Sequence, residues 1–150
     1  MKKFFFSLNT VLNYKEQALE SLRGEHARSL MKVRECEEAI EVLEEQYRAC
    51  VDEFEEKEKT GISISGMKVY ESYLEGLGIR ILENEKRLKV LQREEEKKRD
   101  QVVEAKKEST SIQKLKEKKQ QEYRRQEQKE NELLVEEFVS TRNAMAKLNG

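Results

Sequence analysis

The sequence of 150 residues contains no proline and no tryptophan, and it has one histidine. Because proline breaks helix interiors and marks loops, its absence leaves the chain free to run in long, uninterrupted helices. The sequence lacks a GxxxxGK[ST] loop for nucleotide phosphates, and one histidine leaves no pair or triad for acid–base chemistry. We therefore expect no enzymatic activity, no catalytic residues and no bound cofactor.

The two cysteines, Cys36 and Cys50, would lie about 21 Å apart on one helix, which is beyond disulfide reach. We expect buried free thiols and no metal site, because no partners with metal-ligand spacing accompany them.

Long apolar runs are also missing. No stretch approaches the roughly 18 residues of a membrane span, and the apolar start at residues 4–6 is too short for a signal peptide. The net charge of −1 gives no reason to expect nucleic-acid binding. We expect a cytoplasmic, soluble protein that reaches a membrane only through its partners.

The chain is rich in charge, with 41% Asp, Glu, Lys and Arg, and its apolar residues follow heptads. A sustained heptad pattern predicts a coiled coil rather than a disordered chain. The core positions of the first track are Phe5, Leu8, Leu12, Lys15, Leu19, Leu22, His26, Ser29, Val33, Cys36, Ile40, Leu43, Tyr47, Cys50 and Phe54, most of which are apolar.

A second heptad track follows the segment KTGISISG at residues 59–66. Gly61 suits the left-handed residue that ends a helix, and Ser63 or Ser65 can cap the next one. The second track is well formed from Tyr70 to Leu91 and becomes polar beyond it. The expected fold is all-α: one antiparallel two-helix coiled-coil hairpin over 1–150, with a helix at about 5–58, a turn at about 59–65 and a longer helix at about 66–147.

The two tracks stay in register when paired residue numbers sum to 124. In this register His26 meets Lys98 and Ser29 meets Glu95, which predicts a polar belt in the middle of the hairpin. Polar residues at core positions cost stability but can fix the register. The longer helix should extend beyond its partner from residue 120 to 147, with an exposed apolar stripe. Such a stripe marks a binding surface; fraying or self-association through 120–147 is the open alternative.

Charge is unevenly placed along the chain. Residues 35–58 carry 11 acidic and 2 basic side chains, whereas residues 86–129 carry 16 basic and 9 acidic ones. We expect part of this charge to pair across the hairpin. The basic excess at residues 114–129 is either a solvated helix face or a surface for an acidic partner.

Three stretches resemble the FliJ family of the bacterial flagellar type III export apparatus. They are FFFSLNTVLNYK at residues 4–15, the turn and helix start at residues 61–77, and KLKEKKQQEYRR at residues 114–125, which continues to EEF at 136–138. Val135 departs from the family pattern, which often has an aspartate there.

This resemblance implies a stalk-like protein that binds the hexameric export ATPase and promotes its assembly and turnover. It also implies contact with the cytoplasmic domain of the export gate protein, and escort of export chaperones. The protein would act in the cytoplasm, peripheral to the inner membrane at the flagellar base. An injectisome export ATPase stalk and a purely structural, oligomerising coiled coil are the competing interpretations.

The resemblance also implies contact residues. By position, the export-gate contact would include Leu43, Tyr47, Tyr73 and Leu77. Core packing is the competing interpretation for Leu43, Tyr47 and Leu77, since the register places them in the seam. The ATPase-ring contact would include Tyr123, Arg124, Arg125, Leu133 and Phe138.

Overall fold

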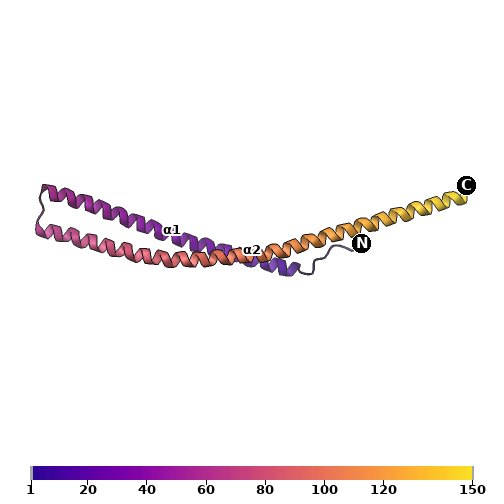
Figure 1. Ribbon diagram of the computed structural model, residues 1–150, viewed down its shortest axis with the longest axis horizontal. Helices are drawn as coiled ribbons and strands as arrows, with labels where there is room; N and C mark the ends of the chain where they lie inside the picture. The colour runs from indigo at the N-terminus through magenta and orange to yellow at the C-terminus, as the bar shows by residue number, and fades with distance from the viewer. Residues whose placement is uncertain (1, 150) are drawn as a thin grey trace. The chain divides into compact units, whose positions relative to one another are not determined.

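The computed structural model describes residues 2–149, which form two long helices and a short connection. Helix α1 spans Asn9–Thr60 and helix α2 spans Ile64–Asn149. On either side of the connection the helices lie antiparallel and next to each other (Figure 1). The predicted fold class, an all-α antiparallel hairpin with a longer second helix, is confirmed.

The residues form two compact units, each built from segments of both helices. The turn unit is Glu20–Val103 and includes the connection; the terminal unit combines the residues up to Leu19 with those from Glu104 onward. Each unit is a pair of antiparallel segments.

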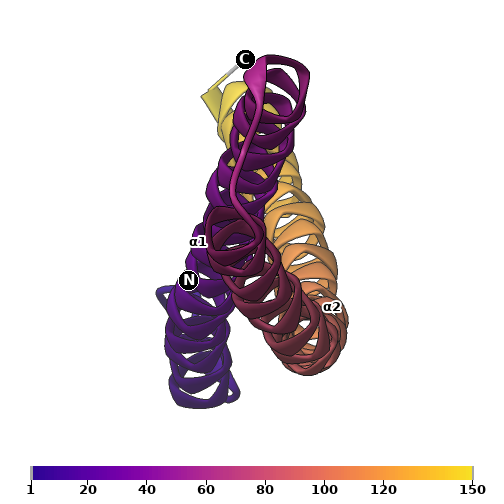
Figure 2. The ribbon, with the colours of Figure 1, turned by 90° about the vertical axis from the view of Figure 1, so that its left-hand side faces the viewer.

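The connection ends one helix and starts the next within three residues. Gly61 has a φ of 103°, the left-handed conformation that glycine adopts without strain. Ser63 is the N-cap of α2: its Oγ accepts a hydrogen bond from the Gly66 amide at 3.1 Å, and its carbonyl accepts one from the Met67 amide. Figure 2, seen from this end, shows the connection passing between the two helix ends.

Replacing Ser63 with Ala should lower the free energy of unfolding by about 1 kcal/mol, because the first turn of α2 loses its cap. Chemical denaturation followed by circular dichroism measures this. Ser65→Ala is the matched control, since the cap is made by Ser63. Equal losses in the two variants would contradict the assignment of the cap.

The seam of the turn unit contains the residues that the heptads predict. Val33, Cys36, Ile40, Cys50 and Leu77 are buried. The rings of Phe54 and Tyr70, whose numbers sum to 124, have centroids 5.1 Å apart. The expected register is therefore correct at the turn, and both cysteines are buried free thiols, as expected.

The seam of the terminal unit continues on the same heptad positions, although these become more polar. Leu12, Leu19 and Ser109 are buried, and Ile112 and Lys116 are half-buried. Polar groups pair across this part of the seam: Lys15 Nζ lies 2.9 Å from Glu108 Oε2, and Lys116 Nζ donates to Asn9 Oδ1 at 3.0 Å. The weak second half of the second track thus still faces α1.

The expected helix start near residue 5 is wrong, because residues 2–8 form a non-helical segment, here called the arm. A turn in which the Asn9 amide donates to the Phe6 carbonyl precedes α1. From Phe4 to Ser7 the side chains alternate between the inside and the outside, as in an extended chain. Phe6 is 7% exposed, whereas Phe5, the expected core residue, is 84% exposed.

The arm also corrects the expected start of the unpaired part of α2. An extended chain advances about 3.3 Å per residue against 1.5 Å in a helix, so the arm reaches farther along α2 than a helix would. Phe4 packs edge-on against Tyr123, with ring centroids 5.6 Å apart, and the Tyr123 hydroxyl donates to the Lys2 carbonyl. The uncovered part of α2 therefore begins at Arg124 rather than at residue 120; it is here called the overhang (residues 124–149), and all its side chains are exposed.

Candidate partner-binding surfaces

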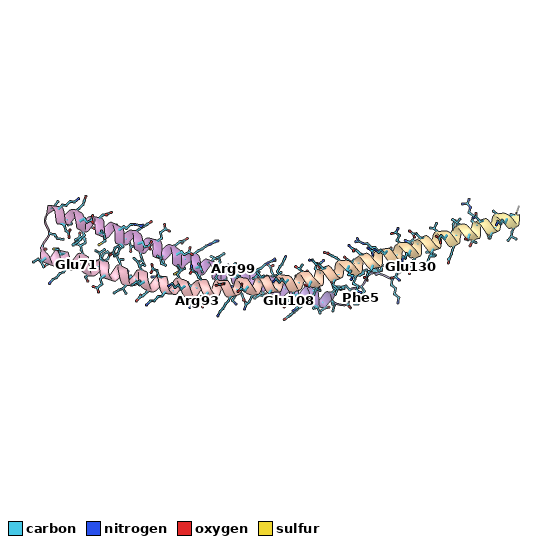
Figure 3. The ribbon with its side chains drawn as sticks, in the orientation of Figure 1. Phe5, Glu71, Arg93, Arg99, Glu108 and Glu130 are labelled. Atoms are coloured by element: carbon cyan, nitrogen blue, oxygen red, sulfur yellow. The ribbon has the colours of Figure 1, made fainter. Side chains whose placement is uncertain are left out.

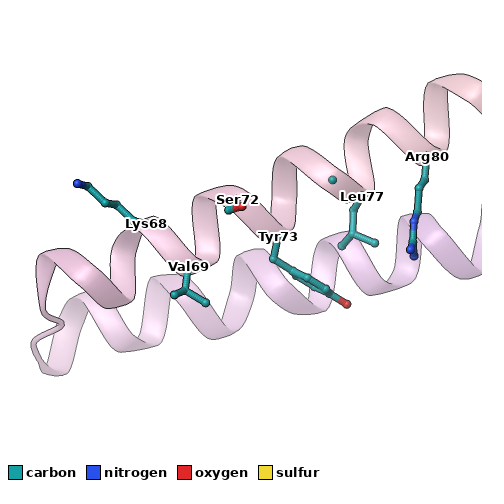
Figure 4. Close-up of a pocket in the computed structure, with 7 residues that line it drawn as sticks. Lys68, Val69, Ser72, Tyr73, Leu77 and Arg80 are labelled. Atoms are coloured by element: carbon teal, nitrogen blue, oxygen red, sulfur yellow. The ribbon is translucent and has the colours of Figure 1, made fainter.

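Near the turn, α2 presents a shallow groove of about 560 Å³ with Tyr73 at its centre. In Figure 4 the side chains of Val69, Tyr73 and Leu77 point towards α1, whereas Lys68 points away from it. Tyr73 is 53% exposed and Leu77 is 3% exposed, although both line the groove. Of these two predicted gate-contact residues, only Tyr73 is accessible to a partner while the seam stays closed.

The two predicted gate-contact residues of α1 differ in the same way. Leu43 is half-buried and lines a second shallow groove with Ala39 and Val42. Tyr47 is exposed, although the register places it in the seam. A tyrosine ring can lie along the edge of a seam while its hydroxyl stays in water. The turn unit thus places all four predicted gate-contact residues within a few helical turns of the connection.

A third groove, of about 590 Å³, runs between the helices on the turn side of Tyr73. Its walls include Ala49 and Cys50 of α1 and Val69 and Tyr70 of α2. Burial raises the pKa of the Cys50 thiol above its ordinary value, so this wall behaves as an apolar surface rather than as a reactive thiolate.

The acidic stretch at residues 35–58 remains exposed, which corrects the expected pairing of charge across the hairpin. All 11 of its carboxylates are exposed, and none forms a salt bridge within residues 2–149. The reason is the register: the segment of α2 opposite this stretch, at residues 66–89, carries 5 basic and 4 acidic residues and is nearly neutral. The surface around the predicted gate contact is therefore strongly acidic.

The polar belt exists in the turn unit, but its partners differ from those expected. His26 Nε2 lies 2.8 Å from Glu95 Oε1, and Arg99 donates to both oxygens of Glu95, at 3.1 and 2.6 Å. Lys98 Nζ donates to Glu25 Oε2 at 2.8 Å. These contacts replace the expected pairs His26–Lys98 and Ser29–Glu95. Lys98 reaches the carboxylate of Glu25, and Glu95 reaches His26, about one helical turn from its expected partner Ser29, because opposite charges attract.

The hydrogen bonds from Arg99 and His26 lower the pKa of the Glu95 carboxyl from 4.5 to about 2. An ionised carboxylate only accepts hydrogen bonds, so His26 carries a proton on Nε2 in this pair. The cluster is a network of N–H groups around one carboxylate. Such a network suits a role in fixing the register of the two helices.

The cluster predicts how stability depends on pH. A carboxylate whose pKa is lower in the folded state stabilises the fold above its unfolded pKa, and this stabilisation is lost as the pH falls through the folded value. The thermal midpoint should therefore fall between about pH 5 and pH 2, and Glu95→Gln should make that fall smaller. Thermal unfolding followed by circular dichroism at several pH values measures both. An unchanged pH profile in Glu95→Gln would contradict this role.

The predicted ATPase-contact residues lie in the terminal unit and fall into two groups. Tyr123 is half-buried and is held by the arm. Arg124, Arg125, Leu133 and Phe138 are exposed on the overhang. Figure 3 shows the side chains around Glu130 with no second helix beside them.

The overhang combines two chemical characters. Residues 114–129, which lead into the overhang and form its start, carry 7 basic and 3 acidic side chains. Farther along, exposed apolar residues gather: Leu133, Leu134, Val135, Phe138, Val139, Met145 and Leu148. The overhang thus starts with a basic stretch and continues with exposed apolar side chains that no other described part of the chain covers.

Sequence reasoning missed the arm as part of this end of the molecule. Phe4 packs against Tyr123 of α2 and Phe6 is buried, while Phe5 is exposed. The arm and α2, from Leu115 to Gln126, together line a small surface groove. The available signal was the turn sequence Ser7–Asn9 after three phenylalanines, because Ser and Asn favour turns and helix starts.

The family model described as flagellar FliJ protein matches residues 4–147, which is nearly the whole chain. The chain belongs to the FliJ family. The resemblance to this family is thereby confirmed, and the match includes residues 4–8 of the arm, α1, and α2 as far as residue 147. No curated protein and no solved structure matches the chain.

Membership of the FliJ family gives the chain a role in flagellar protein export. The family is a non-catalytic component of flagellar protein export. Within residues 2–149, no helix is long and apolar enough to cross a membrane. In the same range, no group of three or more His, Cys, Asp or Glu side chains could hold a metal ion.

Proposed function

We propose that this FliJ-family chain is a stalk-like connector that binds the flagellar export ATPase with its overhang and the export gate protein with its turn unit. The observation that supports the first contact most strongly is the overhang itself. It is a helix of 26 residues with an exposed apolar surface that no other described part of the chain covers. Exposed apolar patches of this kind mark sites of interaction with other proteins.

The ATPase contact would use Arg124, Arg125, Leu133 and Phe138. A helix inside a ring of subunits is contacted from several sides, and these residues point in several directions around the axis of α2. Tyr123 would act indirectly, because it already packs on Phe4 and anchors the arm. The chain would promote assembly of the ATPase hexamer by offering one helix around which its subunits gather.

The gate contact would centre on Tyr73. Its ring is half exposed within a groove, and aromatic residues in grooves are frequent anchors of interfaces. Tyr47 and Leu43 would extend the surface on α1, while Leu77 supports it from the core. The acidic stretch beside this surface would favour a gate segment of positive charge.

The chain would work in the cytoplasm, peripheral to the inner membrane at the flagellar base, and would reach the membrane through the gate protein. It would also escort export chaperones. The match to a flagellar family supports this setting over the injectisome alternative.

The experiment that tests the ATPase contact is a measurement of ATP hydrolysis by the purified export ATPase with increasing amounts of the chain. We expect hydrolysis to rise together with the fraction of hexamers, as determined by sedimentation. Unchanged hydrolysis and an unchanged hexamer fraction would contradict the proposed contact.

A further inference from the structure

The apolar residues of the overhang include one straight line along the helix. Leu134, Phe138, Met145 and Leu148 follow one another at steps of four, seven and three residues, and Asn131 and Thr141 complete the same line. These alternating steps of three and four place all six on one side of the helix. The four apolar members are all strongly exposed.

We propose that this line pairs with the same line of a second copy of the chain, with the two helices antiparallel over residues 131–148. The line is self-complementary in that direction. When paired residue numbers sum to 279, Leu134 meets Met145 of the second copy and Phe138 meets Thr141. Asn131 meets Leu148 at the two ends, so every layer contains an apolar residue.

Charge complementarity selects the antiparallel direction. The acidic residues of this segment, Glu132, Glu136 and Glu137, all lie in its first half. Its basic residues, Arg142 and Lys147, both lie in its second half. Antiparallel pairing places the acidic half of each copy beside the basic half of the other, whereas parallel pairing would place like charges together.

The arm selects the same direction. It covers α2 as far as Tyr123, and the groove beside it is lined as far along α2 as Gln126. In the antiparallel register the last helical residue of the second copy, Asn149, lies opposite residue 130 and therefore clears the arm. A parallel second helix would continue past residue 131 towards the turn unit and run into the arm.

The size of the contact makes the pair reversible. Burial of each Leu, Phe or Met side chain removes about 100 Å² of surface from water, so eight of them remove roughly 800 Å². Stable interfaces bury about 1,200–2,000 Å² in total, and the flanking residues add only part of the difference. We expect a dissociation constant of the dimer in the micromolar range.

The pairing does not rest on the proposed ATPase contact, since it needs only this chain. If both hold, they exclude each other, because both use Phe138. A second copy would then keep the apolar line covered until the ATPase ring is available.

The first test is sedimentation of the full chain over a range of concentrations. We expect a monomer at low concentration and a dimer at high concentration. Leu134→Glu should weaken the dimer at least about a hundredfold, since it places two charges in the seam. Leu133→Glu is the matched control: Leu133 is 58% exposed and Leu134 is 62% exposed, but Leu133 points away from the line. A monomer at every concentration, or equal effects of the two variants, would overturn the proposal.

The second test is disulfide cross-linking, which reports direction. The double variant Leu134→Cys with Met145→Cys should form a covalent dimer under mild oxidation, because the two positions face each other across the antiparallel seam. Leu134→Cys alone should remain a monomer. The natural thiols of Cys36 and Cys50 are buried and should not compete. Efficient cross-linking of Leu134→Cys alone would show a parallel pair and overturn the antiparallel register.

Discussion

Removal of residues 129–150 is expected to abolish stimulation of the export ATPase while the rest of the chain keeps its helices. The side chains lost from 129–149 are all exposed, so their removal uncovers no part of the seam. The arm stays in place, because Phe4 and Tyr123 are both retained. Hydrolysis assays measure the stimulation, and circular dichroism with thermal unfolding measures the remaining fold.

A single substitution refines this truncation. Phe138→Ala should weaken binding to the ATPase by about thirtyfold, the loss expected when an aromatic anchor worth about 2 kcal/mol is removed. Val139→Ala is a matched control on the same turn of the overhang. Full stimulation by the truncated chain would instead place the ring contact on the arm or on the paired part of the terminal unit.

Replacing Tyr73 with Ala should weaken binding to the cytoplasmic domain of the gate protein by about thirtyfold, with little change in thermal stability. The ring is 53% exposed, so its loss opens no cavity in the seam. Leu77→Ala provides the contrast. That side chain is buried, so its removal should lower the free energy of unfolding by about 2–5 kcal/mol.

Calorimetric titration with the gate domain and chemical denaturation of each variant separate these two roles. The decisive pattern is lost binding without lost stability for Tyr73. Unchanged binding by Tyr73→Ala would move the gate contact away from this groove. A large loss of stability in the same variant would show that Tyr73 belongs to the core.

The seam of the hairpin was predictable because its apolar residues repeat over many heptads. From Tyr70 to Lys116, every heptad core position of α2 is buried or half-buried, including polar residues such as Glu95 and Ser109. Once the register is set by Phe54 and Tyr70 at the turn, the continuous helices carry it onward. The core positions of α2 beyond Leu91 therefore stay in the seam, although many of them are polar.

The arm was not predictable from the same pattern. Three consecutive phenylalanines fit a helical and an extended period equally well, because a short apolar run has no measurable period. The choice depends on Tyr123, which lies more than a hundred residues away and offers both a ring and a hydroxyl to the arm. The pairs within the polar belt escaped prediction for a related reason: long side chains such as Arg99 select partners over a full helical turn.

The contact surfaces were predictable in kind but not in detail. Charge counts placed an acidic stretch on one segment and a basic stretch on another, and the exposed carboxylates at residues 35–58 agree with that. The heptad register separated Tyr73 from Leu77, because Leu77 is a core position whereas Tyr73 lies next to the core position Leu74. Their exposed fractions, 53% and 3%, agree with this. The register did not predict that Tyr47, also a core position, would be exposed.

The most direct test of the two-ended connector is a sedimentation experiment with three components: the export ATPase, the gate domain and the full chain. We expect the gate domain to sediment with the ATPase hexamer only when the chain is present. Either the truncation after residue 128 or Tyr73→Ala alone should break this link. If the gate domain instead displaced the ATPase from the chain, the two partners would share one surface, and the chain would not be a two-ended connector.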